Sequence, residues 1–123
     1  MSYRVTVSAR FEAAHNLIDY AGGPEPLHGH SYRVEAVLVS EKLQQYDLAV
    51  DFVPARAALQ AIANEFDYKY INEHPAFRGR NTSAENLARF FAERLEASGA
   101  LGWSLVAEVT VWEGPENRAT FRP

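Results

Sequence analysis

Alternation of apolar and polar residues marks four segments of the chain as strands. Residues 3–15 alternate in this way, and residues 28–38 repeat the pattern after a loop rich in glycine and proline. Because successive side chains of a strand point to opposite faces, each segment has one apolar face, and the loop favours an antiparallel hairpin. Residues 103–112 and 118–121 also alternate, on either side of a short turn, and predict a second strand pair.

Two segments between these strand pairs have apolar residues at helical spacing. The first begins near Pro54, a residue that the first turn of a helix tolerates. Its apolar stripe consists of Ala55, Leu59, Ile62, Ala63 and Phe66. The second begins with the Thr-Ser-Ala-Glu sequence of residues 82–85, which has the spacing of a capping box, and ends near Gly99. The order ββααββ predicts an α+β fold with two helices on an antiparallel sheet.

The edges of such a sheet predict association between subunits. Four strands leave two open edges, which natural proteins cover, and both faces of segment 103–112 carry large apolar residues. Sheets of neighbouring subunits that joined into a closed barrel would remove these edges. We therefore expect an oligomer.

Length and composition limit the class of protein. The chain has 123 residues, which we interpret as a single domain spanning residues 1–123. Its formal net charge is −4 and it has no long basic run, so a nucleic-acid partner is not indicated. No apolar run approaches the roughly 20 residues that span a bilayer, and no signal-peptide pattern is present. We expect a cytoplasmic protein with no membrane partner.

Three of the four histidines form the strongest chemical signal in the chain. His28 and His30 are two residues apart on one predicted strand, so both imidazoles lie on the same face. The predicted hairpin brings them opposite the strand end that carries His15. Three histidines without a fourth protein ligand are typical of a catalytic zinc, and the absence of cysteine excludes a closed thiolate site. The alternative is that all three are ordinary strand histidines.

Five short motifs resemble, in order, those of the 6-pyruvoyltetrahydropterin synthase and 6-carboxytetrahydropterin synthase family. They are Phe-Glu-Ala-Ala-His at residues 11–15, His-Gly-His-Ser-Tyr at 28–32, Val-Asp-Phe at 50–52, Asn-Thr-Ser-Ala-Glu-Asn at 81–86 and Val-Trp-Glu at 111–113. The resemblance covers residues 3 to 114. It implies a tunnelling fold of ββααββ subunits, in which trimers stack into a homohexamer and the active site lies between neighbouring subunits.

The resemblance also implies roles for particular residues. His15, His28 and His30 match the ligands of Zn²⁺, and Glu113 matches the glutamate that anchors the guanidine-like edge of a pterin. A carboxylate suits that edge because it accepts two parallel, charge-assisted hydrogen bonds. Thr82 and Ser83 match the segment that helps to hold the pterin. Helix capping is an equally good explanation for Thr82, and an exposed turn carboxylate is the alternative for Glu113.

The chain departs from the family pattern at two positions where the family has residues that transfer protons. The usual cysteine is absent before the His-Gly-His sequence, and Glu25 stands nearby between two prolines. This variant resembles a subgroup in which a glutamate is the base. Asp67 is retained, but Tyr68 stands where the family has a histidine, in an irregular connection whose length hints at function. His74, in the same connection, is the one remaining histidine that could serve in acid–base work.

Two functions from different classes follow. The first is a zinc-dependent lyase that acts on the side chain of 7,8-dihydroneopterin triphosphate, with Glu25, Asp67 and Tyr68 as candidate catalytic residues. Its product would be 6-carboxytetrahydropterin or 6-hydroxymethyl-7,8-dihydropterin, in queuosine or folate biosynthesis. The second is a catalytically altered relative that keeps the metal and binds a pterin or purine-like ligand. The position of Glu25 relative to the histidines distinguishes the two.

Overall fold

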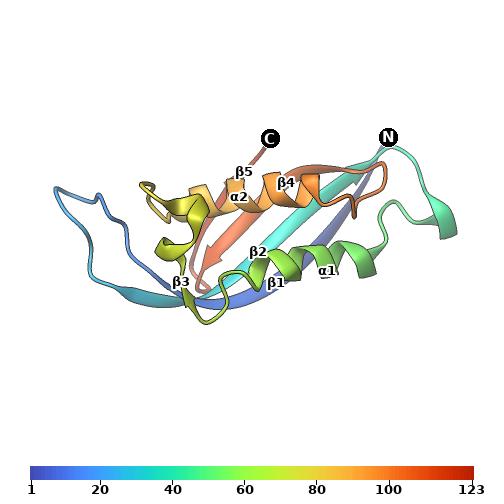
Figure 1. Ribbon diagram of the computed structural model, residues 1–123. Helices are drawn as coiled ribbons and strands as arrows, with labels where there is room; N and C mark the ends of the chain where they lie inside the picture. The colour runs from blue at the N-terminus through green and yellow to red at the C-terminus, as the bar shows by residue number, and fades with distance from the viewer.

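The computed structural model describes residues 1–123 and consists of a five-stranded sheet with two helices on one of its faces (Figure 1). The strands lie in the order β3-β1-β2-β4-β5. The elements are β1 (Tyr3–His15), β2 (His28–Ser40), α1 (Phe52–Ala63), β3 (Lys69–Tyr70), α2 (Ala84–Ala97), β4 (Leu105–Glu113) and β5 (Asn117–Phe121). The predicted order ββααββ is confirmed, with one short additional strand between the helices.

The longest hairpin, β1–β2, carries the histidines at its closed end. The two strands pair along their whole length, from Tyr3 opposite Ser40 to His15 opposite His28. In the same register Ala13 lies opposite His30, so all three imidazoles lie at one end of the sheet and on its helix-covered face. The connecting loop projects beyond that end (Figure 1).

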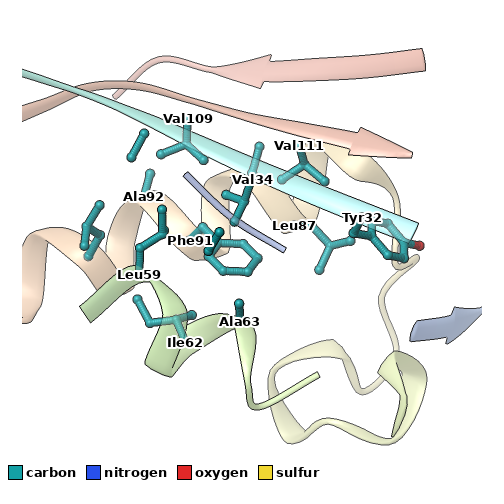
Figure 2. Packing of buried hydrophobic residues seen from close by; sticks show 14 of the residues in the cluster. Tyr32, Val34, Leu59, Ile62, Ala63, Leu87, Phe91, Ala92, Val109 and Val111 are labelled. Atoms are coloured by element: carbon teal, nitrogen blue, oxygen red, sulfur yellow. The ribbon is translucent and has the colours of Figure 1, made fainter. Parts of the chain in front are cut away.

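A single cluster of 26 buried residues fills the space between the sheet and the helices. Figure 2 shows Phe91 of α2 at its centre, between Leu59 and Ala63 of α1 and Val34 of β2. At the end near the histidines, Phe11 stacks on Tyr32 with ring centroids 4.7 Å apart. Close packing of this kind makes the hairpin a rigid support for the residues at its end.

The connection between the helices contains a strand that the sequence pattern did not predict. Lys69 and Tyr70 form β3, which pairs in parallel with Ala13 and Ala14 of β1. Two residues are too few to show an alternation, so the segment had no recognisable period. The rest of the connection forms two turns of 3₁₀ helix, at Ile71–Glu73 and Pro75–Phe77.

The predicted capping box before α2 is wrong by one residue. Ser83, not Thr82, is the N-cap, and its hydroxyl accepts a hydrogen bond from the Asn86 backbone N–H at 3.2 Å. The side chain of Thr82 points instead toward the histidines. At the start of α1, Asp51 caps the helix by accepting from the Val53 N–H at 3.0 Å. Neither helix has the length and hydrophobicity needed to cross a bilayer.

Candidate metal centre

The imidazoles of His15, His28 and His30 converge at the end of the hairpin, as the sequence pattern predicted. One ring nitrogen from each lies within 4.8 Å of those of the other two. The Nε2 atoms of His15 and His28 are 3.1 Å apart. His15 is the most buried of the three, with 2% of its surface exposed. A set of three neutral nitrogen donors at this spacing can hold one divalent ion.

The outer nitrogens of two imidazoles are held by backbone carbonyl groups. His15 Nδ1 lies 2.8 Å from the carbonyl oxygen of Thr82, and His28 Nδ1 lies 2.9 Å from that of Pro26. A carbonyl oxygen can only accept, so in each ring Nδ1 carries a proton and donates it. The Nε2 atoms are then left to face the centre, which is how histidine ligands of metals are commonly oriented.

The carboxylate of Glu113, at the end of β4, lies against the same imidazoles. Its Oε2 is 3.2 Å from His15 Nε2 and 3.1 Å from His30 Nε2. The hydrogen bond with His15 lowers the pKa of Glu113. Burial by itself would lower the pKa of His15, but its hydrogen bonds with Glu113 and the Thr82 carbonyl raise it. Burial lowers the pKa of His30, which favours the neutral ring that a metal requires.

His30 gives a direct test of whether these residues fit a metal. Its Nε2 is buried and makes no hydrogen bond of acceptable geometry, despite the nearby carboxylate. A buried polar atom without a partner is unfavourable, and a metal at the centre would satisfy it. The donor set of three imidazoles therefore fits Zn²⁺ or a similar divalent ion.

Glu25 is turned toward the histidines and not toward solvent. Its Oε1 accepts a hydrogen bond from the Leu17 N–H at 2.8 Å and lies 3.9 Å from His28 Nε2. Its backbone N–H donates to the Leu17 carbonyl at 3.0 Å, which ties the two sides of the loop together. The side chain is 21% exposed, so it borders the cluster at an accessible place.

Asp67 and Tyr68 make no hydrogen bond to the imidazoles of the cluster within one chain. The Oδ1 of Asp67 accepts from the Glu12 N–H at 2.8 Å, beside the open face of the sheet. Tyr68 is 84% exposed and has a positive φ of 56°. It lines a pocket of about 480 Å³ whose other lining residues include Glu12, Gly29 and His30. A catalytic role for either residue stays a prediction and would need a site shared with a neighbouring subunit.

His74 belongs to a separate cluster. Its Nε2 lies 2.9 Å from Glu65 Oε1, and its Nδ1 accepts from the Ala76 N–H at 3.1 Å. The ring packs against Phe66 and Phe90, with centroids 4.8 and 5.3 Å away. Both nitrogens are therefore engaged away from the three-histidine cluster, and the structure gives no support to a role for His74 in acid–base work there.

Thr82 and Ser83 are side by side in sequence but serve different contacts. Thr82 is fully buried, and its hydroxyl lies 3.1 Å from His15 Nδ1. Ser83 caps α2. Sequence reasoning missed two further polar residues at the site, Asn16 and Asn72, which hydrogen-bond to each other and to the Thr82 hydroxyl. Neither belongs to a periodic pattern, so the chain alone carried no signal of their contacts.

A mostly antiparallel sheet covered by two helices defines an α+β domain, and three imidazoles at the end of its longest hairpin form a candidate metal centre. The family model described as 6-pyruvoyl tetrahydropterin synthase matches residues 4–123. The chain belongs to this family. The sequence-based predictions of the family, the fold and an enzyme are confirmed.

The names of two similar proteins and of one similar solved structure are consistent with this family. A 6-carboxy-5,6,7,8-tetrahydropterin synthase of Aquifex aeolicus is 27% identical, with 99% of both chains covered. A dihydroneopterin monophosphate aldolase of Pyrococcus furiosus is 28% identical, with 94% of both chains covered. Among solved structures, the 6-pyruvoyl tetrahydropterin synthase of Caenorhabditis elegans has a TM-score of 0.82 at 18% identity. That alignment covers 100% of this chain and 96% of the other, and it supports the fold.

Proposed function

We propose that this protein is a Zn²⁺-dependent lyase that acts on the side chain of 7,8-dihydroneopterin triphosphate. The observation that carries the proposal is the placement of the Glu25 carboxylate 3.9 Å from His28 Nε2, beside three converging imidazoles. The family and the names of the relatives support a pterin as the substrate.

His15, His28 and His30 would hold the metal, which supplies a Lewis acid that makes bound hydroxyls and adjacent C–H groups easier to deprotonate. Glu25 is the group we assign to move the proton. Its Oε1 is fixed by the Leu17 N–H, while Oε2 has no hydrogen bond to the protein and is free to accept a proton. A solved relative from Plasmodium vivax, 18% identical, is a variant in which a catalytic glutamate has been replaced.

Glu113 is assigned to the guanidine-like edge of the pterin. Its carboxylate Oε2 lies 3.2 Å from His15 Nε2 and 3.1 Å from His30 Nε2. If His15 Nε2 held a metal, it would not donate to Glu113, and the carboxylate would be available to a substrate. The two oxygens can then accept two parallel hydrogen bonds from the pterin.

The second candidate function is a zinc-containing relative that binds a pterin or purine-like ligand without the lyase reaction. The observation that favours it is the position of Asp67 and Tyr68, neither of which hydrogen-bonds to a histidine of the cluster in its own subunit. If the site lies between subunits, a neighbour supplies these groups and the lyase assignment stands.

We also propose that the chain forms a homohexamer, a dimer of trimers in the cytoplasm, in which sheets join into a barrel. The open edges support this proposal. Along β1 only Ala13 and Ala14 are covered by β3, and β5 has no neighbour on its outer side. Sedimentation at micromolar concentration tests the assembly, and a monomer there would contradict it.

The reaction is tested by incubating the zinc-loaded protein with 7,8-dihydroneopterin triphosphate and identifying products by mass spectrometry. We expect 6-carboxytetrahydropterin or 6-hydroxymethyl-7,8-dihydropterin, and the mass decides between them. Glu25→Gln should keep the zinc but lose turnover, whereas the matched change Glu41→Gln, in an exposed turn after β2, should have no effect. Full activity in Glu25→Gln would remove Glu25 from the mechanism.

A further inference from the structure

All but one of the polar groups of Glu25 are bonded to the two residues that directly follow β1. The Glu25 N–H donates to the Leu17 carbonyl at 3.0 Å, and the Glu25 carbonyl accepts from Asn16 Nδ2 at 3.1 Å. Glu25 Oε1 accepts from the Leu17 N–H at 2.8 Å. The remaining group is Oε2, the oxygen that the proposed function assigns to proton transfer.

The loop that carries Glu25 has no other means of holding this residue. Pro24 and Pro26 flank it and have no N–H, so the Glu25 N–H is the only backbone donor in residues 24–26. Within residues 18–27 only Gly23 and Glu25 are not exposed, so the loop has no core of its own. The position of the carboxylate therefore depends on the contacts with the end of β1.

The amide of Asn16 is oriented by a partner on each side. A carbonyl oxygen can only accept, so the amide presents Nδ2 to Glu25 and Oδ1 to the opposite side. There Oδ1 accepts from the hydroxyl of Tyr70, the last residue of β3. Tyr70 pairs with Ala14 of β1, so both partners of this hydrogen bond are fixed to the same part of the sheet. The Tyr70 hydroxyl thus keeps the amide donor directed at the Glu25 carbonyl.

The side chain of Asn16 is connected to the proposed base and not to the metal centre. Its hydrogen bonds go to Glu25 and Tyr70 and to no histidine. The backbone N–H and carbonyl of Asn16 are bonded separately, to the side chain of Asn72. Truncation of the Asn16 side chain therefore removes the contact with Glu25 and leaves the path of the chain after β1 in place.

We propose that Asn16, oriented by Tyr70, is a positioning residue that holds the loop so that the free carboxylate oxygen of Glu25 stays beside the metal centre. The inference rests on the proposed function, because that function makes Glu25 the base. Misplacement of a catalytic group by about 1 Å can cost about 100-fold in rate. A loosened loop would therefore lower kcat, while the three imidazoles and Glu113 would keep their places.

The test compares Asn16→Ala, Tyr70→Phe and the double variant with Asn81→Ala as a matched control. The Asn81 side chain makes three hydrogen bonds to residues 18 and 19 of the same loop but none to Glu25. Three properties are measured. They are kcat and KM of the zinc-loaded protein with 7,8-dihydroneopterin triphosphate, the zinc Kd by chelator competition, and the exchange rate of the Glu25 backbone amide by NMR.

We expect Asn16→Ala to lower kcat about 10- to 100-fold, with KM and the zinc Kd within about twofold of the wild type. Its Glu25 amide should exchange about 2- to 10-fold faster, the factor that corresponds to the loss of one hydrogen bond. The double variant should lose no more activity than Asn16→Ala alone, because Tyr70 acts through the Asn16 amide. Asn81→Ala should keep the kcat and the Glu25 amide exchange of the wild type.

Wild-type kcat and Glu25 amide exchange in Asn16→Ala would overturn the inference. An equal fall of kcat in Asn81→Ala would also overturn it, because loosening anywhere in the loop would then suffice. If Asn16→Ala does not fold, Tyr70→Phe decides, and unchanged kcat and amide exchange in that variant would contradict the role of Asn16. A wild-type protein that leaves the substrate unchanged would instead contradict the proposed function, while the amide exchange would still decide whether Asn16 holds the loop.

Discussion

His15 Nδ1 lies 2.8 Å from the carbonyl oxygen of Thr82, a residue 67 positions further along the chain. This contact joins the end of the β1–β2 hairpin to the segment before α2. It also fixes which nitrogen of His15 faces the other imidazoles. The orientation of the metal site thus depends on a residue that sequence analysis assigned either to pterin binding or to helix capping.

Thr82→Val removes the hydroxyl and keeps the backbone carbonyl and most of the side-chain volume. It removes the contacts of the Thr82 hydroxyl with Asn72 Oδ1 and His15 Nδ1, while Asn72 Oδ1 keeps the Asn16 N–H and His15 Nδ1 keeps the Thr82 carbonyl. We expect a loss of about 0.5–1.5 kcal/mol in the free energy of unfolding, the net contribution of a typical hydrogen bond, since both former partners keep another hydrogen bond. Urea denaturation measures this loss in the free energy of unfolding. The control is Thr110→Val, at an exposed Thr110–Thr120 pair on the open face of the sheet, where a change below about 0.5 kcal/mol is expected.

Replacing His15, His28 or His30 by alanine should in each case abolish stoichiometric zinc, because two imidazoles alone are a poor site. The zinc that each variant retains is measured by metal analysis after gel filtration. His74→Ala is the matched control. Its ring nitrogens are engaged by Glu65 and Ala76, so this variant should keep one full equivalent. A full equivalent in all three single variants would mean that the metal lies elsewhere.

Glu65 should make the stability of the protein depend on pH in the acid range. Its hydrogen bond with Arg94 lowers its pKa from the ordinary value of 4.5, with a further contribution from His74. A carboxyl group with a lower pKa in the folded state stabilises the protein above the unfolded value of 4.5. This stabilisation is lost as the pH falls through the folded pKa.

Glu65→Gln should therefore lose stability at pH 7 and show a smaller further loss below pH 4.5 than the wild type. Thermal unfolding across this range measures the difference. The control is Glu93→Gln, at the exposed Arg89–Glu93 pair of α2, which should follow the wild-type pH profile. Identical profiles for Glu65→Gln and the wild type would contradict the prediction.

Phe91 is fully buried at the centre of the core (Figure 2). Phe91→Ala should cost about 3–5 kcal/mol in the free energy of unfolding, because it removes apolar contacts and leaves a cavity. Chemical denaturation measures this change in the free energy of unfolding. Phe52→Ala, at a phenylalanine that is 57% exposed, is the control and should cost much less. Equal losses in the two variants would contradict the core described for this sheet face.

The hairpin and its histidines could be predicted because their pattern is local. Strand alternation assigns every side chain to a face, so His28 and His30 had to share one, and a hairpin had to bring His15 near them. The register confirms this by pairing His15 with His28. The two helices were predictable for the same reason, from the spacing of their apolar residues.

The contacts around the histidines were not predictable in this way. β3 is two residues long, and Asn72 and Thr82 reach the site from the connection between the helices, far along the chain from the hairpin. Their partners are decided by how the connection between the helices packs against the hairpin, which no short-range pattern encodes. The carboxylate of Glu113 was expected at the pterin, and only the structure shows that it also lies 3.1–3.2 Å from two imidazoles.

The most direct test of the account is a single-turnover reaction of zinc-loaded protein with 7,8-dihydroneopterin triphosphate, followed by mass spectrometry, with Glu25→Gln measured in parallel. The account predicts a product with a shortened or eliminated side chain from the wild type. It also predicts that Glu25→Gln holds zinc and intact substrate without converting it. A wild-type protein that binds zinc and the pterin at one equivalent but returns the substrate unchanged would contradict the lyase assignment.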